Sequence, residues 1–334
     1  MVNVGVIGCG MIGKAHIQRL TSNIMGARVV AVSDAFEESA KAGADICGAK
    51  IYEDPKELIA DAEVQAIVIT TPGFAHADLV IAAIQAGKRV FCEKPLATTA
   101  EDCKRVMAAE IEGGKHLVQI GFNRRFDRGY RQMKKVLDAG TLGEPLIVHC
   151  THRNPIVADS YSTEMAVHDT LIHEIDILHW LIGDEYASAQ VIMGKRTKNA
   201  LPHLHDPQVM IFRTKGGITI DVEVFVNCKF AYDINCEVVC EEGTIKLSPP
   251  SEPIIRRDAS VSTALETHWL TRFIESYDTE FQEWIDAAGE GTINGPTSWD
   301  GYVAAITADA FVKAQKTGQV EAIELDQKPA FYAV

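Results

Sequence analysis

The sequence lacks the features that mark membrane, secreted and nucleic-acid-binding proteins. Lys and Arg number 32 against 46 Asp and Glu, which gives a net charge of −14. Surfaces that bind nucleic acid or anionic lipid need clustered Lys and Arg, so this balance disfavours both partners. No run approaches the ~20 apolar residues that span a bilayer. The N-terminus enters a strand-like segment without a secretory signal pattern. We therefore expect a cytoplasmic protein with no membrane or nucleic-acid partner.

Paired cysteines are also missing. The chain has eight cysteines, and none of them forms a CxxC pair. Cysteines that bind metals or act in redox chemistry usually come in such pairs. Most of these cysteines stand in apolar runs, as buried thiols do. The pattern predicts eight reduced cysteines and no cysteine-bound metal.

The first third of the chain alternates strand-like and helix-like segments. Apolar runs predict strands at residues 2–7, 28–33, 66–70, 89–92 and 116–121, with helical stretches between them. Strands separated by helices form parallel sheets through right-handed crossovers. We therefore predict an α/β protein that begins with a Rossmann domain, a doubly wound parallel sheet, over residues 1–122.

The remaining residues, 123–334, predict a second α/β domain that binds substrate and forms an oligomer. After a helix at 128–139, strands are predicted at 146–151, 189–193, 208–213, 218–226, 234–239 and 244–247. The turns between neighbouring strands predict an open, largely antiparallel sheet. Further helices are predicted at 167–181, 269–288 and 298–316, and the last of these could pack back on the first domain. An open sheet must cover its second face, which favours an oligomer.

A glycine-rich segment follows the first predicted strand and opens the first predicted helix. Gly8, Gly10 and Gly13 match GxGxxG, and Met11 and Ile12 lie within the motif. In this context the glycines permit a tight turn, a close approach to a pyrophosphate and close helix–strand packing. The helix N-terminus offers unpaired N–H groups to the anion. These five residues therefore predict a dinucleotide site, and a glycine turn without a ligand is the alternative.

An acidic residue selects between the two dinucleotides. Asp34 ends the second predicted strand, 21 positions after Gly13 (34 − 13). A carboxylate there accepts hydrogen bonds from the ribose hydroxyls of NAD, whereas the 2′-phosphate of NADP needs Arg or Lys. The Ala-Phe-Glu-Glu that follows adds negative charge. NAD is therefore the predicted cofactor, and a helix-capping role for Asp34 is compatible with it.

Polar residues at the ends of two further strands predict the rest of the cleft. Ligands of open α/β sheets bind beyond the carboxyl ends of the strands. Those ends carry Thr70, Thr71, Pro72 and, in the helix that follows, His76, and then Glu93 and Lys94. We predict that all six line the cofactor path, and that the Lys94 ammonium also holds a substrate oxygen. A plain loop or a solvated lysine is the alternative for each residue alone.

The densest group of ionisable residues is HDTLIHEID at 168–176. On a helix Asp169 and His173 are i and i+4, so they share a face, which Asp176 can join. A histidine flanked by carboxylates is a good general base near neutral pH. The alternatives are a capping aspartate with a hydrogen-bonded histidine, and a metal site that includes His168. Oxidation of an alcohol by NAD needs only a base, so we predict no metal.

Four motifs of this chain occur together in one known family. They are GCGMIG at 8–13, EKPLA at 93–97, QIGFNRRFD at 119–127, and the DxxxHxxD spacing that begins at Asp169. In this combination the chain resembles the glucose–fructose oxidoreductase and inositol dehydrogenase family over essentially its whole length. The resemblance implies a catalytic triad of Lys94, Asp169 and His173. It also implies a Rossmann domain, an α/β domain with an open sheet, and a homotetramer.

Other segments look like the NAD-dependent inositol branch of that family. The polyol-binding segments of that branch resemble the segments of this chain that contain Arg124, Arg125, His152, Asn154 and Tyr232. Donors and acceptors at several points suit a ring that carries a hydroxyl on every carbon. The resemblance implies oxidation of myo- or scyllo-inositol to an inosose, with hydride transfer to NAD, in inositol catabolism. The alternatives are another sugar or polyol dehydrogenase of the family and a non-catalytic regulator that senses NAD.

Overall fold

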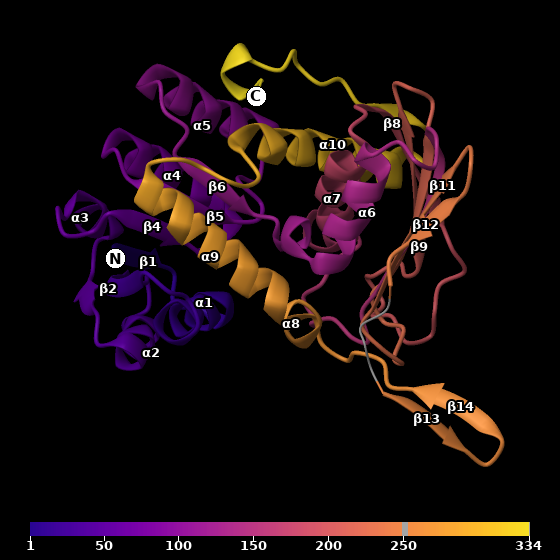
Figure 1. Cartoon of the computed structure of the whole chain (residues 1–334), viewed down its shortest axis with the longest axis horizontal. Helices are drawn as coiled ribbons and strands as arrows, with labels where there is room; N and C mark the ends of the chain where they lie inside the picture. Colours follow the sequence, from indigo (N-terminus) through magenta and orange to yellow (C-terminus); the bar gives the residue numbers. More distant parts are fainter. Residues whose placement is uncertain (249–252, 334) are drawn as a thin grey trace. The chain divides into compact units, whose positions relative to one another are not determined.

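The computed structural model describes residues 1–248 and 253–333, which form two compact units (Figure 1). Unit 1 comprises Met1–Asn123, Glu275–Ile306 and Leu325–Val334, and unit 2 comprises Arg124–Ile274 and Thr307–Glu324. The chain thus leaves unit 1 after Asn123 and returns to it at Glu275. This differs from the single division after residue 122 that the sequence predicted.

Unit 1 is built on a six-stranded parallel sheet in the order β3-β2-β1-β4-β5-β6. Its strands are β1 (Val2–Ile7), β2 (Ala27–Ser33), β3 (Lys50–Tyr52), β4 (Ala66–Ile69), β5 (Arg89–Glu93) and β6 (Val118–Gly121). Every residue of β4 and β6 is buried, as expected for strands covered on both faces. The strand order reverses between β1 and β4, and ligands bind at such a point. The predicted Rossmann arrangement is confirmed, although the short edge strand β3 was missed.

Helices cover the sheet of unit 1. They are α1 (Met11–Ser22), α2 (Glu37–Cys47), α3 (Pro55–Ala60), α4 (His76–Gln85), α5 (Ala100–Gly113), α9 (Ile274–Glu290) and the start of α10 (Ser298–Thr317). One buried cluster joins Ile17 of α1, Phe91 of β5, and Phe281 and Trp284 of α9. The ring centroids of Phe91 and Phe281 are 4.3 Å apart. This apolar contact explains why the late segment that begins at Glu275 belongs to unit 1.

Unit 2 contains a seven-stranded sheet in the order β12-β11-β7-β10-β9-β8-β15. The strands are β7 (Pro145–Arg153), β8 (Tyr186–Met193), β9 (Gln208–Thr214), β10 (Thr219–Phe225), β11 (Asp233–Cys240), β12 (Thr244–Lys246) and β15 (Glu321–Ala322). Only β7 and β10 pair in parallel, so the sheet is largely antiparallel, as predicted. Buried and partly exposed residues alternate along β10 and β11, as in a sheet with one covered face.

The helices of unit 2 are α6 (Arg128–Asp138), α7 (Ile172–Ile182), the short α8 (Trp269–Arg272) and the end of α10. Helices α6 and α7 lie on one face of the sheet, and no helix of the described residues lies on the other (Figure 1). The helix predicted at 269–288 is divided into α8 and α9 at Phe273. A hairpin that was not predicted, β13 (Ile254–Arg257) and β14 (Ser260–Thr263), extends away from the sheet and is fully exposed.

Two further findings concern the whole of the described chain. All eight cysteines are free thiols, as predicted. Within residues 1–248 and 253–333, every helix is too short or too polar to cross a membrane.

Candidate active site

The glycines in the turn between β1 and α1 have different structural roles. Gly8 has a φ of +98°, in the left-handed region that side chains avoid. A Cβ atom on Gly13 would lie 2.0 Å from the Gly8 carbonyl oxygen, so only glycine fits there. A Cβ atom on Gly10 would meet nothing within 4 Å. Packing inside the protein therefore requires Gly8 and Gly13, whereas Gly10 leaves open space beside the backbone.

Helix α1 begins at this turn without a capping side chain. Gly10 is the N-cap residue, and the first turn of the helix holds no acidic residue. Met11 is 67% exposed and Ile12 is half-buried. Unpaired N–H groups at a helix N-terminus attract anions. The open space and the uncapped helix together fit the pyrophosphate of a dinucleotide.

Asp34 ties the end of β2 to the glycine turn. Its carboxylate accepts hydrogen bonds from the backbone N–H of Cys9 at 2.6 Å and of Phe36 at 2.9 Å. Each carboxylate oxygen has a second lone pair, and the side chain is only half-buried. Asp34 can therefore hold the turn and accept from ribose hydroxyls at the same time.

The residues that follow β4 also contact the glycine turn. The Thr70 hydroxyl donates to the Gly8 carbonyl at 2.5 Å. The two ring nitrogens of His76 lie 2.7 Å from the Thr71 carbonyl oxygen and 2.6 Å from that of Pro95. Burial lowers the pKa of His76, so the ring is neutral and donates one of these bonds. His76 thus links two loops, and the cofactor contact expected of it stays a prediction.

The segment Glu93-Lys94-Pro95 follows β5 at the same edge of the sheet. The Glu93 carboxylate is buried and accepts from His16 Nε2 at 2.8 Å and from the Lys94 N–H at 3.1 Å. Burial lowers the pKa of His16, whose Nδ1 accepts from Arg19 at 2.9 Å. Burial is the largest single influence and opposes the charge of Glu93, but His16 and Lys94 together outweigh it and lower the pKa of Glu93. Glu93 therefore ties the backbone at Lys94 to α1, and its predicted contact with a cofactor stays a prediction.

In unit 2, the predicted catalytic helix begins with a different kind of turn. Residues Ala166–Leu171 form a π-helix, and α7 continues from Ile172. π-helical turns occur frequently at functional sites. Asp169 is exposed and His173 is half-buried, so both side chains are accessible to a ligand. The regular helix predicted at 167–181 is therefore wrong in its first turns, because the π-helix inserts an extra residue.

Two arginines pair with acidic residues of α7. Asp176 is buried and accepts from Arg125 Nε at 2.9 Å. Arg124 is 2% exposed and donates to Glu174. Arg124 and Arg125 thus hold α7 in place, and the polyol contacts expected of them stay a prediction.

Glu174 is the centre of a buried ionic cluster, which we define as Arg124, His152 and Glu174. Besides Arg124, Glu174 accepts from His152 Nδ1 at 2.9 Å. The three residues are at most 2% exposed. Burial lowers the pKa of His152. Burial also opposes the charge of Glu174 and is the largest single influence, but Arg124 and His152 together outweigh it and lower the pKa of Glu174. The neutral His152 therefore donates from Nδ1 and keeps an acceptor lone pair on Nε2.

Three residues predicted to bind substrate, namely His152, His173 and Tyr232, lie close together. The ring centroid of His152 is 6.2 Å from that of His173 and 5.8 Å from that of Tyr232. Asn154 follows directly after β7, where its backbone bonds with Phe225 and Cys228. In the described part of the chain, its side-chain amide has no hydrogen-bond partner. Unit 2 thus gathers two imidazoles and a phenol, with a further amide just beyond the end of β7.

Two residues of these sites were not predicted, namely His16 and Glu174. Both are polar residues among apolar neighbours on a helix, and this was the available signal. Such a position predicts burial, and a buried charge needs a partner. No grouping of three His, Cys, Asp or Glu side chains that could hold a metal ion occurs among the residues described.

Two family models match the chain. The oxidoreductase family with an NAD-binding Rossmann fold matches residues 2–122, and the C-terminal alpha/beta domain of the same family matches residues 134–325. Inositol 2-dehydrogenases of Burkholderia cenocepacia and Azotobacter vinelandii are 51% and 52% identical over 99% of this chain and of each relative. The myo-inositol dehydrogenase of Lactobacillus casei, solved with NAD(H) and myo-inositol, has a TM-score of 0.97 and 44% identity, with 99% of each chain covered.

Proposed function

Because this chain belongs to the oxidoreductase family with an NAD-binding Rossmann fold and a C-terminal α/β domain, we propose that it is an NAD-dependent inositol dehydrogenase. Its substrate is myo-inositol, of which it oxidises one ring hydroxyl to give an inosose. The observation that carries this proposal is the full-length similarity to inositol 2-dehydrogenases and to a structure with bound NAD(H) and myo-inositol. The sites of both units support it.

The residues of unit 1 fit NAD. The space beside Gly10 and the N-terminus of α1 suit the pyrophosphate, and the free lone pairs of Asp34 suit the ribose. The buried Thr71 hydroxyl has no partner in the described part of the chain, which leaves one more polar group at this edge of the sheet. When bound, NAD supplies a hydride acceptor at the nicotinamide ring.

We assign the proton transfer to His173 and the binding of the reacting oxygen to Lys94. His173 accepts the hydroxyl proton while a hydride leaves the carbon that carries this hydroxyl. The electron pair of the O–H bond becomes the second bond of the carbonyl group. The Lys94 ammonium stabilises the negative charge that develops on this oxygen. We assign the positioning of His173 to Asp169.

We assign the recognition of the ring to the polar side chains near His152. The lone pair on His152 Nε2 accepts from one ring hydroxyl, because Nδ1 is held by Glu174. The amide of Asn154 and the hydroxyl of Tyr232 add donors and acceptors. Arg124 and Arg125 act indirectly, by holding α7 and hence His173.

The test is NADH formation, followed by absorbance, with myo-inositol, scyllo-inositol and a panel of aldoses, and with NAD or NADP. We expect myo-inositol and NAD to give the highest kcat/KM. Lys94→Ala and His173→Ala should each lower kcat by about 10²–10⁴-fold and leave the Kd for NAD near that of wild type. The double variant should be little worse than the slower single variant, because residues that act as a unit are not additive.

Each other outcome points to a different function. Higher kcat/KM with an aldose would favour another sugar dehydrogenase of the family. Tight NAD binding without NADH formation from any polyol would favour a regulator that senses NAD. A Lys94→Ala or His173→Ala variant with nearly the wild-type kcat would contradict the role given to that residue.

We also infer that the protein is a cytoplasmic homotetramer that assembles through the second face of the unit 2 sheet. No described helix covers this face. The hairpin β13–β14 exposes Ile254, Ile255 and Val261, and an isolated two-stranded hairpin is only marginally stable in water. Free cysteines fit a reducing compartment. Sedimentation equilibrium tests the assembly, and a monomeric mass would contradict it.

A further inference from the structure

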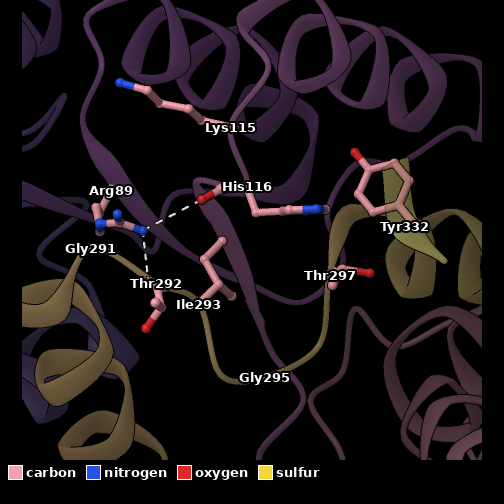
Figure 2. A pocket seen from close by; sticks show the side chains of 9 residues that line it. All are labelled: Arg89, Lys115, His116, Gly291, Thr292, Ile293, Gly295, Thr297 and Tyr332. Atoms are coloured by element: carbon pink, nitrogen blue, oxygen red, sulfur yellow. Dashed lines mark hydrogen bonds between the residues drawn. The ribbon is translucent and has the colours of Figure 1, made fainter. Parts of the chain in front are cut away.

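Unit 1 contains a cavity that the proposed reaction does not use (Figure 2). It has a volume of about 550 Å³ and is lined by residues at the amino ends of β5 and β6, by the segment 291–297 and by Tyr332. Arg89 is the first residue of β5, and Lys94 follows the last. The cavity therefore lies at the opposite edge of the parallel sheet from Lys94 and the glycine turn.

One side of the cavity carries cations without acidic partners. Arg89 Nη1 donates to the carbonyl oxygens of Thr292 at 2.7 Å and of His116 at 3.4 Å, as the dashed lines in Figure 2 show. Burial lowers the pKa of Arg89, and no acidic neighbour opposes this shift. Lys115 is exposed, and the described residues give it no hydrogen bond or ion pair. In a chain with a net charge of −14, two such cations in the lining of one cavity make this part of it locally positive.

Hydroxyl groups line another part of the same cavity. The Thr297 hydroxyl donates to Asp300 at 2.8 Å, and the Tyr332 hydroxyl donates to Glu110 at 2.9 Å. Both protons point to carboxylates of the protein, so the free lone pairs of these oxygens can only accept from a ligand. Ile293 adds an apolar surface between the two polar parts.

A neighbouring cavity has the opposite charge. It is lined by Glu283, Asp286 and Glu290 of α9, and it shares only Thr292 and Ile293 with the first cavity. Carboxylates repel a bound anion, so they would confine its charge to the side of Arg89 and Lys115.

We propose that the cavity binds a small phosphorylated sugar or polyol. Its phosphate lies on Arg89 and Lys115, because a guanidinium matches phosphate geometry and an ammonium adds charge. Its hydroxyls donate to Thr297 and Tyr332. The volume lies in the range of about 300–1,000 Å³ that is usual for small-molecule sites. The candidate dinucleotide site and this second site would thus occupy opposite edges of the unit 1 sheet.

The test is isothermal titration of the full-length protein with glucose 6-phosphate, inorganic phosphate and glucose, in the presence of saturating NADH. The NADH occupies the pyrophosphate site at the glycine turn. We expect glucose 6-phosphate to bind once per chain, and more tightly than phosphate or glucose. Lys115→Gln and Arg89→Gln should weaken it by about 10-fold or more, the usual effect of losing a charged hydrogen bond.

The control is Lys56→Gln, which removes an exposed lysine of α3 that does not line the cavity. It should bind glucose 6-phosphate as wild type does. Thermal unfolding identifies any loss of fold in Arg89→Gln, and Lys115→Gln keeps the test valid because its side chain is exposed. Absence of saturable binding, or equal affinity in Lys115→Gln and wild type, would overturn the proposal. Equal affinity for phosphate and glucose 6-phosphate would overturn the role of the hydroxyls.

Discussion

The glycine turn of unit 1 and the ionic cluster of unit 2 hold polar ligands in opposite ways. The turn offers backbone N–H groups, open space at Gly10 and no capping side chain. The cluster consists of three side chains, Arg124, His152 and Glu174, each at most 2% exposed and each bonded within the cluster. The first site is made by the absence of side chains, and the second by side chains that fix one another.

This difference has a physical consequence for how each site fails. A backbone site loses function when an atom is added, because the ligand or the neighbouring backbone already occupies the space. A buried ionic site fails when an atom is removed, because the remaining charge stays in a low-dielectric environment without compensation. A substitution that adds an atom should therefore damage the glycine turn, whereas one that removes an atom should damage the ionic cluster.

The largest effect is expected from removing the acid of the ionic cluster. Glu174→Ala leaves Arg124 buried without its carboxylate, and breaking such a pair typically costs about 3–5 kcal/mol of unfolding free energy. Asp45→Ala is the control, because the Lys41–Asp45 pair is about two-thirds exposed and such pairs contribute about 0.5 kcal/mol. Urea unfolding measures both. Equal losses in the two variants would show that burial does not distinguish the cluster.

A smaller effect is expected from adding a methyl group to the glycine turn. In Gly13→Ala the new atom would meet the Gly8 carbonyl at 2.0 Å, so unit 1 should lose about 1–3 kcal/mol together with NAD affinity. In Gly10→Ala no protein atom is met, so stability should stay within about 0.5 kcal/mol of wild type. Its Kd for NAD should nevertheless rise by at least about tenfold. Titration and thermal unfolding separate the two, and wild-type NAD affinity in Gly10→Ala would contradict the comparison.

The same difference explains which features could be predicted. The glycine turn is local, so its sequence of strand, glycines and helix was sufficient to predict it. Strands β1, β2, β4 and β5 were found because a buried parallel strand is a continuous apolar run. Strand β3 has only three residues, two of them exposed, and carries no such run. The π-helical turn was hidden because the apolar residues around it follow ordinary helical spacing.

The partners of the buried charges could not be predicted, because they lie far apart in the sequence. Glu93 bonds to His16 across 77 positions, and Asp176 bonds to Arg125 across 51 positions. Periodicity and spacing report on one element at a time, whereas these bonds depend on how elements pack. Helical spacing could place Asp176 on a face near His173, but it could not identify Arg125 as the partner of Asp176.

The third effect in size is expected from changing the dinucleotide preference of the glycine turn. Replacing Asp34 with Ser and Ala35 with Arg removes the ribose acceptor and supplies a cation for a 2′-phosphate. The ratio of kcat/KM for NAD to that for NADP should fall by at least about tenfold, or about 1.4 kcal/mol. Asp34→Asn is the matched control. It keeps the acceptor for the Cys9 N–H and adds no cation, so it should not gain activity with NADP. An unchanged ratio in the double variant would count against the role of Asp34.

The smallest effect for a single side chain is expected from the titration of a buried histidine, and pH should separate folding from cofactor binding. Burial lowers the pKa of His16, His76 and His152, so the folded protein keeps them neutral. Unfolded histidines gain a proton below pH of about 6.5. The unfolded chain then binds more protons than the folded one, so the unfolding free energy falls as the pH is lowered.

Between pH 7.5 and 5.5 each of these histidines should contribute a loss of at most about 1 kcal/mol. His152→Gln removes one such group, so its loss over this range should be smaller than that of wild type by about this amount. The glycine turn holds no group that titrates in this window, since burial raises the pKa of Cys9 to about 12. The Kd for NAD should therefore stay constant while stability declines. If NAD affinity instead fell in parallel with stability, the glycine turn would depend on the buried side chains. The glycine turn and the ionic cluster would then not be independent of each other.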